Sequence, residues 1–132
     1  MAQSMVEYLR SDMECEGLLE CLHGLTDLDR ETFQVLVRAD DPMTVDELVE
    51  GVDRERSTVY RSVQRLLEAG LVTKAQVNYE HGGYYHVYQP TDAEEIAANM
   101  QRLLNDWYAK MGQLIAEFED KYEDAPTLAV ED

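Results

Sequence analysis

The segment from Thr44 to Gly70 constrains the fold most, because its pattern predicts two short helices in immediate succession. Thr44, with Glu47 three residues later, forms the capping box that starts a helix. Gly70 occupies the position at which helices commonly end. Within each helix the apolar residues recur at helical spacing and form one stripe. They are Val45, Leu48, Val49 and Val52 in the first helix, and Val59, Val63, Leu66 and Leu67 in the second.

The segments on either side complete a recognisable order of elements. A helix of about twelve residues is expected between the cap candidates at residues 26–27 and the break at residues 40–42. Residues 71–79 and 84–89 are rich in β-branched and aromatic residues, and the glycines between them allow a tight hairpin. This order predicts a mainly α fold with a small β-hairpin wing (α+β), a winged helix-turn-helix over residues 26–90. Residues 1–25 form an N-terminal helical extension, in which residues 4–23 are one interrupted helix or two short ones.

A long helix is predicted over residues 91–123, followed by a disordered tail at residues 124–132. Its apolar residues repeat every 11 positions, which keeps the stripe straight along the helix. A helix of about 45 Å outruns a small domain, so the stripe is expected to meet the same helix of a second copy. The alternative is a stripe packed on its own domain. The predicted homodimer interface, shared with the N-terminal helix, comprises Ile96, Met100, Leu103, Trp107, Met111, Leu114 and Phe118.

The stretch from Thr44 to Val72 resembles the DNA-reading segment of archaeal and bacterial winged-helix regulators, and is similar to the TrmB, MarR and PadR families. The match is strongest at R-S-T-V-Y-R, residues 56–61. The resemblance covers residues 26–89 and implies a sequence-specific DNA-binding transcription regulator rather than an enzyme. In the turn, Asp53 and Arg54 stand where these families usually have glycine and an apolar residue, and Glu55 stands where serine is common. The start of the second helix therefore stays open by two or three residues.

Size and build also resemble small haloarchaeal stress regulators of the RosR type. No second domain like the sugar-sensing one of larger TrmB proteins is expected in these 132 residues. An effector would therefore bind the dimer interface, or the protein would sense salt or redox state directly. The alternative function is that of a protein-interaction winged helix in a basal transcription complex.

The predicted DNA surface rests on charge as well as on the resemblance. Residues 54–66 contain four arginines against one glutamate, a net charge of +3 and the one strongly basic window in a chain of net charge −17. A recognition helix places its N-terminal residues at base edges in the major groove, although an arginine face in solvent is the simpler alternative. The wing contact is expected to be weak, because the hairpin tip carries Glu80 and no arginine. The predicted DNA-binding residues are Thr44, Arg54, Arg56, Ser57, Thr58, Tyr60, Arg61 and Arg65, with Lys74, Gln76, His81, Gly82 and Gly83 in the wing.

The acidic residues are dispersed along the chain, 28 against 11 basic residues, of which three are lysine. Dispersed acids indicate a charged surface rather than an acidic tail. At molar salt the Debye length falls to about 3 Å, which screens the repulsion between such acids. We therefore predict a high-salt cytoplasm, with cations bridging the DNA interface; an acidic protein of an ordinary cytoplasm is the alternative. No signal peptide and no membrane-spanning run is visible in the sequence.

Cys15, Cys21 and His23 are the remaining candidates for chemistry. Their spacing matches no zinc-finger pattern, and the two cysteines would point about 120° apart on a helix. We expect them to be small buried residues near the dimer core, with no metal or cofactor bound; a redox or metal sensor is the alternative. The tyrosines of the hairpin are expected to pack across the strands, and His86 is expected to pack in its strand rather than to bind a ligand.

Overall fold

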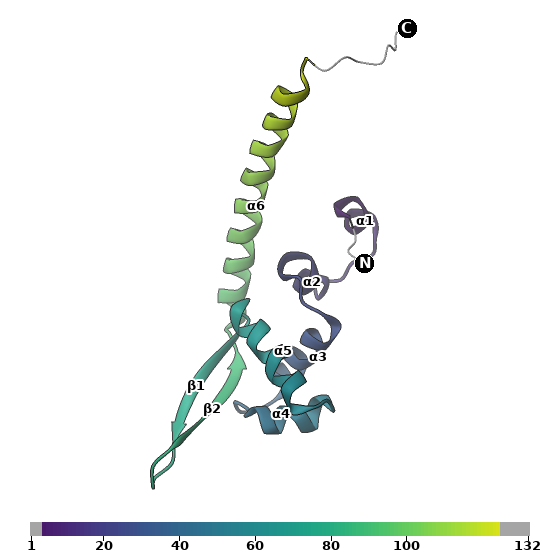
Figure 1. The fold of residues 1–132 in the computed structure, drawn as a ribbon. Coiled ribbons are helices and arrows are strands. Elements are labelled where there is room, and N and C mark those ends of the chain that lie inside the picture. The colour runs from purple at the N-terminus through teal and green to yellow at the C-terminus, as the bar shows by residue number, and fades with distance from the viewer. Residues whose placement is uncertain (1–3, 125–132) are drawn as a thin grey trace. The chain divides into compact units, whose positions relative to one another are not determined.

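The computed structural model describes residues 4–124, and its elements follow the predicted order (Figure 1). Residues 4–23 form two short helices rather than one interrupted helix. The predicted disordered tail lies, beyond Asp124, outside the described residues. The elements are α1 (Met5–Arg10), α2 (Gly17–His23), α3 (Asp27–Arg38), α4 (Val45–Val52), α5 (Arg56–Glu68), β1 (Val72–Asn78), β2 (Tyr84–Pro90) and α6 (Ala93–Tyr122).

The chain divides into two compact units after Ala97, inside the helix predicted to begin at residue 91. In the first unit α3, α4 and α5 pack on one another, and the hairpin contacts α3 and α5. The predicted stripes supply much of the core: of their eight residues in α4 and α5, six are buried, and Val49 and Leu67 are half-buried. The apolar side chains with at most 3% exposure are Leu36, Leu48, Val52, Val59, Val63, Leu66, Leu71, Val72 and Tyr88.

Local sequence signals set the ends of these helices. The capping box at Thr44 is present: its Oγ1 accepts from the Glu47 amide at 3.1 Å, and the Glu47 carboxylate accepts from the Thr44 amide at 2.8 Å. Asp53, which follows α4, has φ 62° and ψ 52°, the left-handed region that favours glycine and that Asp tolerates. The turn keeps the geometry that a glycine would give, and α5 begins at Arg56.

The hairpin pairs β1 and β2 antiparallel, with Val72 opposite Pro90 and Asn78 opposite Tyr84. Gly82 and Gly83 at its tip have φ values of 101° and 83°, as their positions between the strands predicted. The hairpin is also tied to the segment before α4, because Met43 and Tyr88 exchange two backbone hydrogen bonds of 2.9 and 2.7 Å. This attachment fixes the wing beside the helix pair.

A buried carboxylate fastens α5 to α3. Asp29, whose exposed fraction is 0%, accepts a bidentate pair from Arg65, Nε to Oδ2 and Nη2 to Oδ1, both at 2.8 Å. The Ser62 hydroxyl donates to Asp29 Oδ1 at 2.6 Å and lies 3.0 Å from Thr32 Oγ1. Asp29 also completes the capping box of α3, accepting from the Thr26 amide at 3.1 Å. One side chain thus caps the start of α3 and holds α5.

The pKa of Asp29 shows which contribution dominates at this site. Burial alone raises the pKa of this carboxyl, because a low-dielectric site disfavours its charged form. Hydrogen bonds from Arg65, Ser62 and the Thr26 amide, with the charge of Arg65, outweigh burial and hold the pKa below its ordinary value. The hydrogen bonds to Asp29 and its negative charge raise the pKa of Arg65. The pair is therefore ionised in the folded protein at neutral pH.

The second unit consists of the rest of α6, and α6 as a whole contains no buried residue. Of the predicted interface residues, Ile96, Met100 and Met111 are half-buried. The exposed fractions of Leu103, Leu114 and Phe118 are 38%, 40% and 67%. Within residues 4–124 no helix is both long and apolar enough to cross a membrane.

Replacing Asp29 with asparagine should lower the free energy of unfolding by roughly 2–4 kcal/mol at pH 7, because the partners lose a charged acceptor. The difference in free energy of unfolding between the parent and this variant should shrink in acid. The folded-state pKa of Asp29 is lowered, so its carboxylate stabilises the fold fully above its unfolded pKa, near 4. That stabilisation is lost as the pH falls through the folded-state pKa. Urea unfolding at pH 7 and pH 3.5 measures both. Asp27→Asn, at an exposed carboxylate paired with Arg30, is the control and should change little. Equal stability of the two variants at pH 7 would contradict the role of Asp29.

Candidate nucleic-acid interface

The first half of α5 presents polar and basic side chains to solvent. Val59 and Val63 are buried on the inner face of α5, so the residues on its opposite face point outward. Arg54, Arg56, Ser57, Tyr60 and Arg61 are exposed, and Thr58 is half-buried. The structure therefore brings the predicted contact residues of the helix together on one outward surface, with Thr44 at the start of α4 half-buried beside it.

The four arginines of the basic window differ in their surroundings. Arg61 and Arg54 are exposed, and Arg54 donates to the carbonyl oxygen of Asp53 at 3.1 Å. Arg56 Nε donates to Asp46 Oδ1 at 2.8 Å, between two exposed side chains. Arg65 pairs with the buried Asp29, and its own side chain is 40% exposed, so its DNA contact stays a prediction. The net charge of +3 in this window overstates the free positive charge at the surface.

The wing carries its predicted residues on exposed positions. Lys74, Gln76, His81, Gly82 and Gly83 are all exposed. Gln76 donates to the Asn78 side chain at 2.9 Å, which agrees with their predicted common face. Tyr79 and Tyr85 pack across the hairpin, as predicted, with their rings 5.0 Å apart. The other two ring contacts are local: Tyr79 stacks on His81 at the tip at 5.4 Å, and Tyr84 meets His86 of the same strand at 5.4 Å.

A cleft of about 620 Å³ lies between α4, α5 and the hairpin, within the first unit. Tyr88 is almost fully buried there; burial and the neighbouring Tyr60 raise its pKa, while the charge of Arg56 lowers it. The outward surface of α5 and the wing thus border one depression. The lining residues are Thr44, Val45, Asp46, Glu47, Arg56, Tyr60, Tyr79, Tyr85, His86 and Tyr88.

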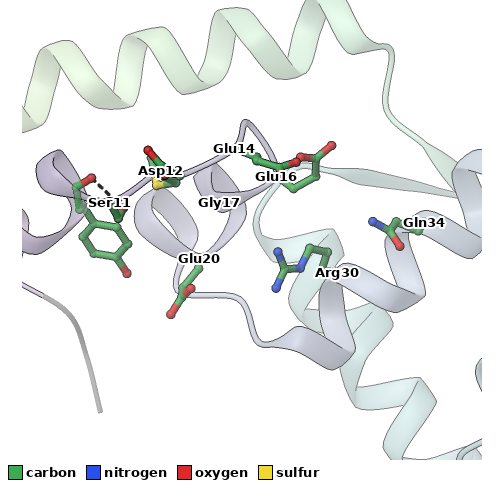
Figure 2. Close-up of a pocket in the computed structure, with 10 residues that line it drawn as sticks. Ser11, Asp12, Glu14, Glu16, Gly17, Glu20, Arg30 and Gln34 are labelled. Atoms are coloured by element: carbon green, nitrogen blue, oxygen red, sulfur yellow. Dashed lines mark hydrogen bonds between the residues drawn. The ribbon is translucent and has the colours of Figure 1, made fainter.

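A second cleft of about 630 Å³ involves α1, α2 and α3 and contains none of the predicted DNA-binding residues. Figure 2 shows Arg30 and Gln34 on α3, and Glu14 and Glu16 on the segment that leads into α2. The lining includes Asp12 and Glu20 as further acids but only Arg30 as a base. A surface with this balance repels a polyanion such as DNA.

Both cysteines are exposed free thiols, so their predicted burial is wrong. Cys15 lies in the segment before α2 and Cys21 in α2, where Leu19 is the residue that is buried. His23 is half-buried, and burial lowers its pKa. Among residues 4–124 no three His, Cys, Asp or Glu side chains are placed to hold a metal ion.

The packed helices α3, α4 and α5, the outward face of α5 and the attached hairpin define a winged helix-turn-helix protein. The family described as "Sugar-specific transcriptional regulator TrmB" matches residues 19–94. The chain therefore belongs to the TrmB family of transcriptional regulators. This family assignment confirms the predicted resemblance to TrmB and supports a DNA-binding regulator rather than an enzyme.

Relatives and solved structures agree with this assignment. The uncharacterized protein MJ1503 of Methanocaldococcus jannaschii is 33% identical over 104 residues, which cover 79% of this chain and 78% of the relative. A structure described as a possible transcriptional regulator from Methanosarcina mazei Go1 superposes with a TM-score of 0.71 at 25% identity, covering 89% of this chain and 99% of that one. The ST1889 protein of Sulfolobus tokodaii gives a TM-score of 0.56 at 25% identity, covering 76% and 93%.

Proposed function

We propose that this chain binds a specific double-stranded DNA sequence as a homodimer and regulates transcription in a high-salt cytoplasm. Helix α5 enters the major groove, and the β1–β2 hairpin lies against the neighbouring backbone. The observation that carries this proposal is the outward surface of α5, which gathers Arg56, Ser57 and Arg61 over a core that holds the helix rigidly. Side chains of these types bond base edges and phosphates.

The contacts follow from position along α5. Arg56, Ser57 and Tyr60 lie in the first turns, which reach base edges when a recognition helix enters the groove. Arg61 is exposed further along, and Lys74 in β1 offers the wing a positive charge for phosphate. His81, Gly82 and Gly83 form a tip narrow enough to approach the backbone.

Replacing Arg61 with alanine should weaken binding to a DNA duplex selected by the parent protein from a random pool, while leaving the fold intact because this side chain is exposed. A lost base contact should cost about 1–3 kcal/mol and relax one base pair, whereas a lost phosphate contact should weaken all duplexes alike. Fluorescence anisotropy with selected and scrambled duplexes measures both.

Arg30→Ala is the control, since it removes the same charge from a half-buried position in α3 that lines the second cleft instead of the predicted DNA surface. It should bind as the parent does. Unchanged affinity of both the Arg61 variant and Arg56→Ala, or an equal loss in the control, would contradict the assignment of α5. A protein that selects no duplex at all would favour a protein-interaction module.

The homodimer is supported by the apolar residues of α6. Leu103, Leu104, Trp107, Leu114, Ile115, Phe118 and Tyr122 each have an exposed fraction of 38% or more. Soluble proteins rarely leave a contiguous apolar surface of this kind uncovered. The repeat of 11 residues aligns these side chains along a helix of about 45 Å, and the same helix of a second copy offers a matching stripe. Met5, Val6 and Leu9 of α1, also exposed, are proposed to join the interface.

Placing glutamate at both Leu103 and Leu114 should convert the dimer to a monomer, because it buries like charges in the proposed interface. The control places glutamate at Asn105 and Ala116, which keep the spacing of 11 but lie about 200° further round the helix. Sedimentation in high salt should give half the parent mass for the first variant and the parent mass for the control. A dimer mass for both, or a monomeric parent, would contradict this interface.

The high-salt setting is supported by the net charge of −17 and by the acids around the DNA surface. Asp46, Glu47, Glu50, Asp53 and Glu55 all lie exposed in α4 or the following turn. Screening, or cations taken up between these acids and the phosphates, would allow the approach of DNA. No further cofactor is proposed. The resemblance to haloarchaeal stress regulators of the RosR type stays a prediction.

Affinity for the selected duplex should stay flat or rise as KCl increases from about 0.3 M toward molar concentration. Counterion release from DNA lowers affinity with salt, but cation uptake by the acidic surface opposes it. Replacing Glu55 and Glu80 with glutamine should restore a steeper decline. A parent affinity that falls steeply with salt, as for an ordinary basic repressor, would contradict the high-salt proposal. It would not affect the assignment of α5 as the recognition helix.

A further inference from the structure

We infer that Asp46 is a positioning residue that holds Arg56 for guanine recognition, an inference that rests on the proposed DNA-binding function. The two residues belong to different helices and are ten positions apart in the sequence. Asp46 lies in the first turn of α4, and Arg56 is the first residue of α5. Arg56 Nε donates to Asp46 Oδ1 at 2.8 Å. This contact is the direct link between the exposed faces of the two helices at the DNA surface.

The geometry of the pair leaves Arg56 able to read a base. The contact with Asp46 uses Nε, so the two terminal nitrogens are free of it. These nitrogens can bond O6 and N7 of one guanine together, the most common specific contact in the major groove. Asp46 therefore occupies the Nε side of the guanidinium and leaves the two terminal nitrogens to guanine.

Stability does not explain the pair. The exposed fractions of the Arg56 and Asp46 side chains are 65% and 77%, and exposed ion pairs contribute little to folding. The helix dipole favours an acidic side chain in the first turn, which accounts for a carboxylate at position 46. The dipole does not account for its contact with the first residue of the next helix.

A fixed arginine helps binding through conformational entropy. A free arginine loses rotamer freedom when it meets a base, whereas one that is already held loses less. Arg56 also lines the same cleft as Tyr60 of α5 and Tyr88 of the hairpin. The cost is a negative charge close to the phosphates, which high salt screens. Asp46 thus weakens the general electrostatic attraction to DNA and strengthens binding to the specific sequence.

The test compares the parent with Asp46→Asn, Arg56→Ala and the double variant, using the duplex selected by the parent and a scrambled duplex of the same composition. Glu50→Gln is the matched control, because it removes one exposed negative charge from the same helix. Asp46→Asn should lose about 3- to 10-fold affinity for the selected duplex and should lose none for the scrambled one. In the Arg56→Ala background the same change should cause no further loss.

Two results would overturn the inference while leaving the proposed function intact. One is an Asp46→Asn variant that binds both duplexes more tightly by the same factor as the Glu50→Gln control, which would make Asp46 a repulsive acid only. The other is an equal loss with and without Arg56. If neither Arg56→Ala nor Arg61→Ala weakened binding, the proposed recognition helix itself would fail. Melting temperatures close to that of the parent show that each variant is folded.

Discussion

The orientation of α5 depends on one buried carboxylate. Asp29 receives Arg65 and Ser62 from α5 while it caps α3, so the two helices share a single charged acceptor. Such a group is costly to bury unless every partner is in place. The core around Val59, Val63 and Leu66 fixes the distance between the helices, but apolar contacts are not directional. The ion pair adds the direction, and with it the set of side chains that α5 turns outward.

Patterns that act over a few residues were sufficient to predict the elements. The capping box at Thr44, the stripes of α4 and α5 and the two glycines of the hairpin each specify local geometry, and the structure confirms them. Asp53 shows the limit of family comparison, since aspartate adopts the conformation expected of glycine. The fold class could therefore be predicted before any contact was known.

Contacts between distant residues could not be predicted in the same way. Asp29 lies 33 positions from Ser62, and nothing in the local pattern distinguishes its role from that of an ordinary cap residue. The basic window consequently included Arg65, which pairs with the buried Asp29, and Arg56, which meets Asp46. The cysteines were predicted to be buried, yet they lie at exposed positions around α2, where Leu19 is buried instead. The nitrogens that pairing leaves free, rather than residue type alone, decide what each arginine can offer to DNA.

Methylation protection of guanine N7 on a duplex selected from random DNA tests the central claim most directly, because this atom is accessible only in the major groove. We expect two clusters of protected guanines related by two-fold symmetry, with their centres one helical turn of about 10 base pairs, or a multiple of it, apart. A bound duplex whose guanines react as in free DNA would contradict insertion of α5 in the major groove. A single unsymmetrical cluster would contradict its action as a homodimer.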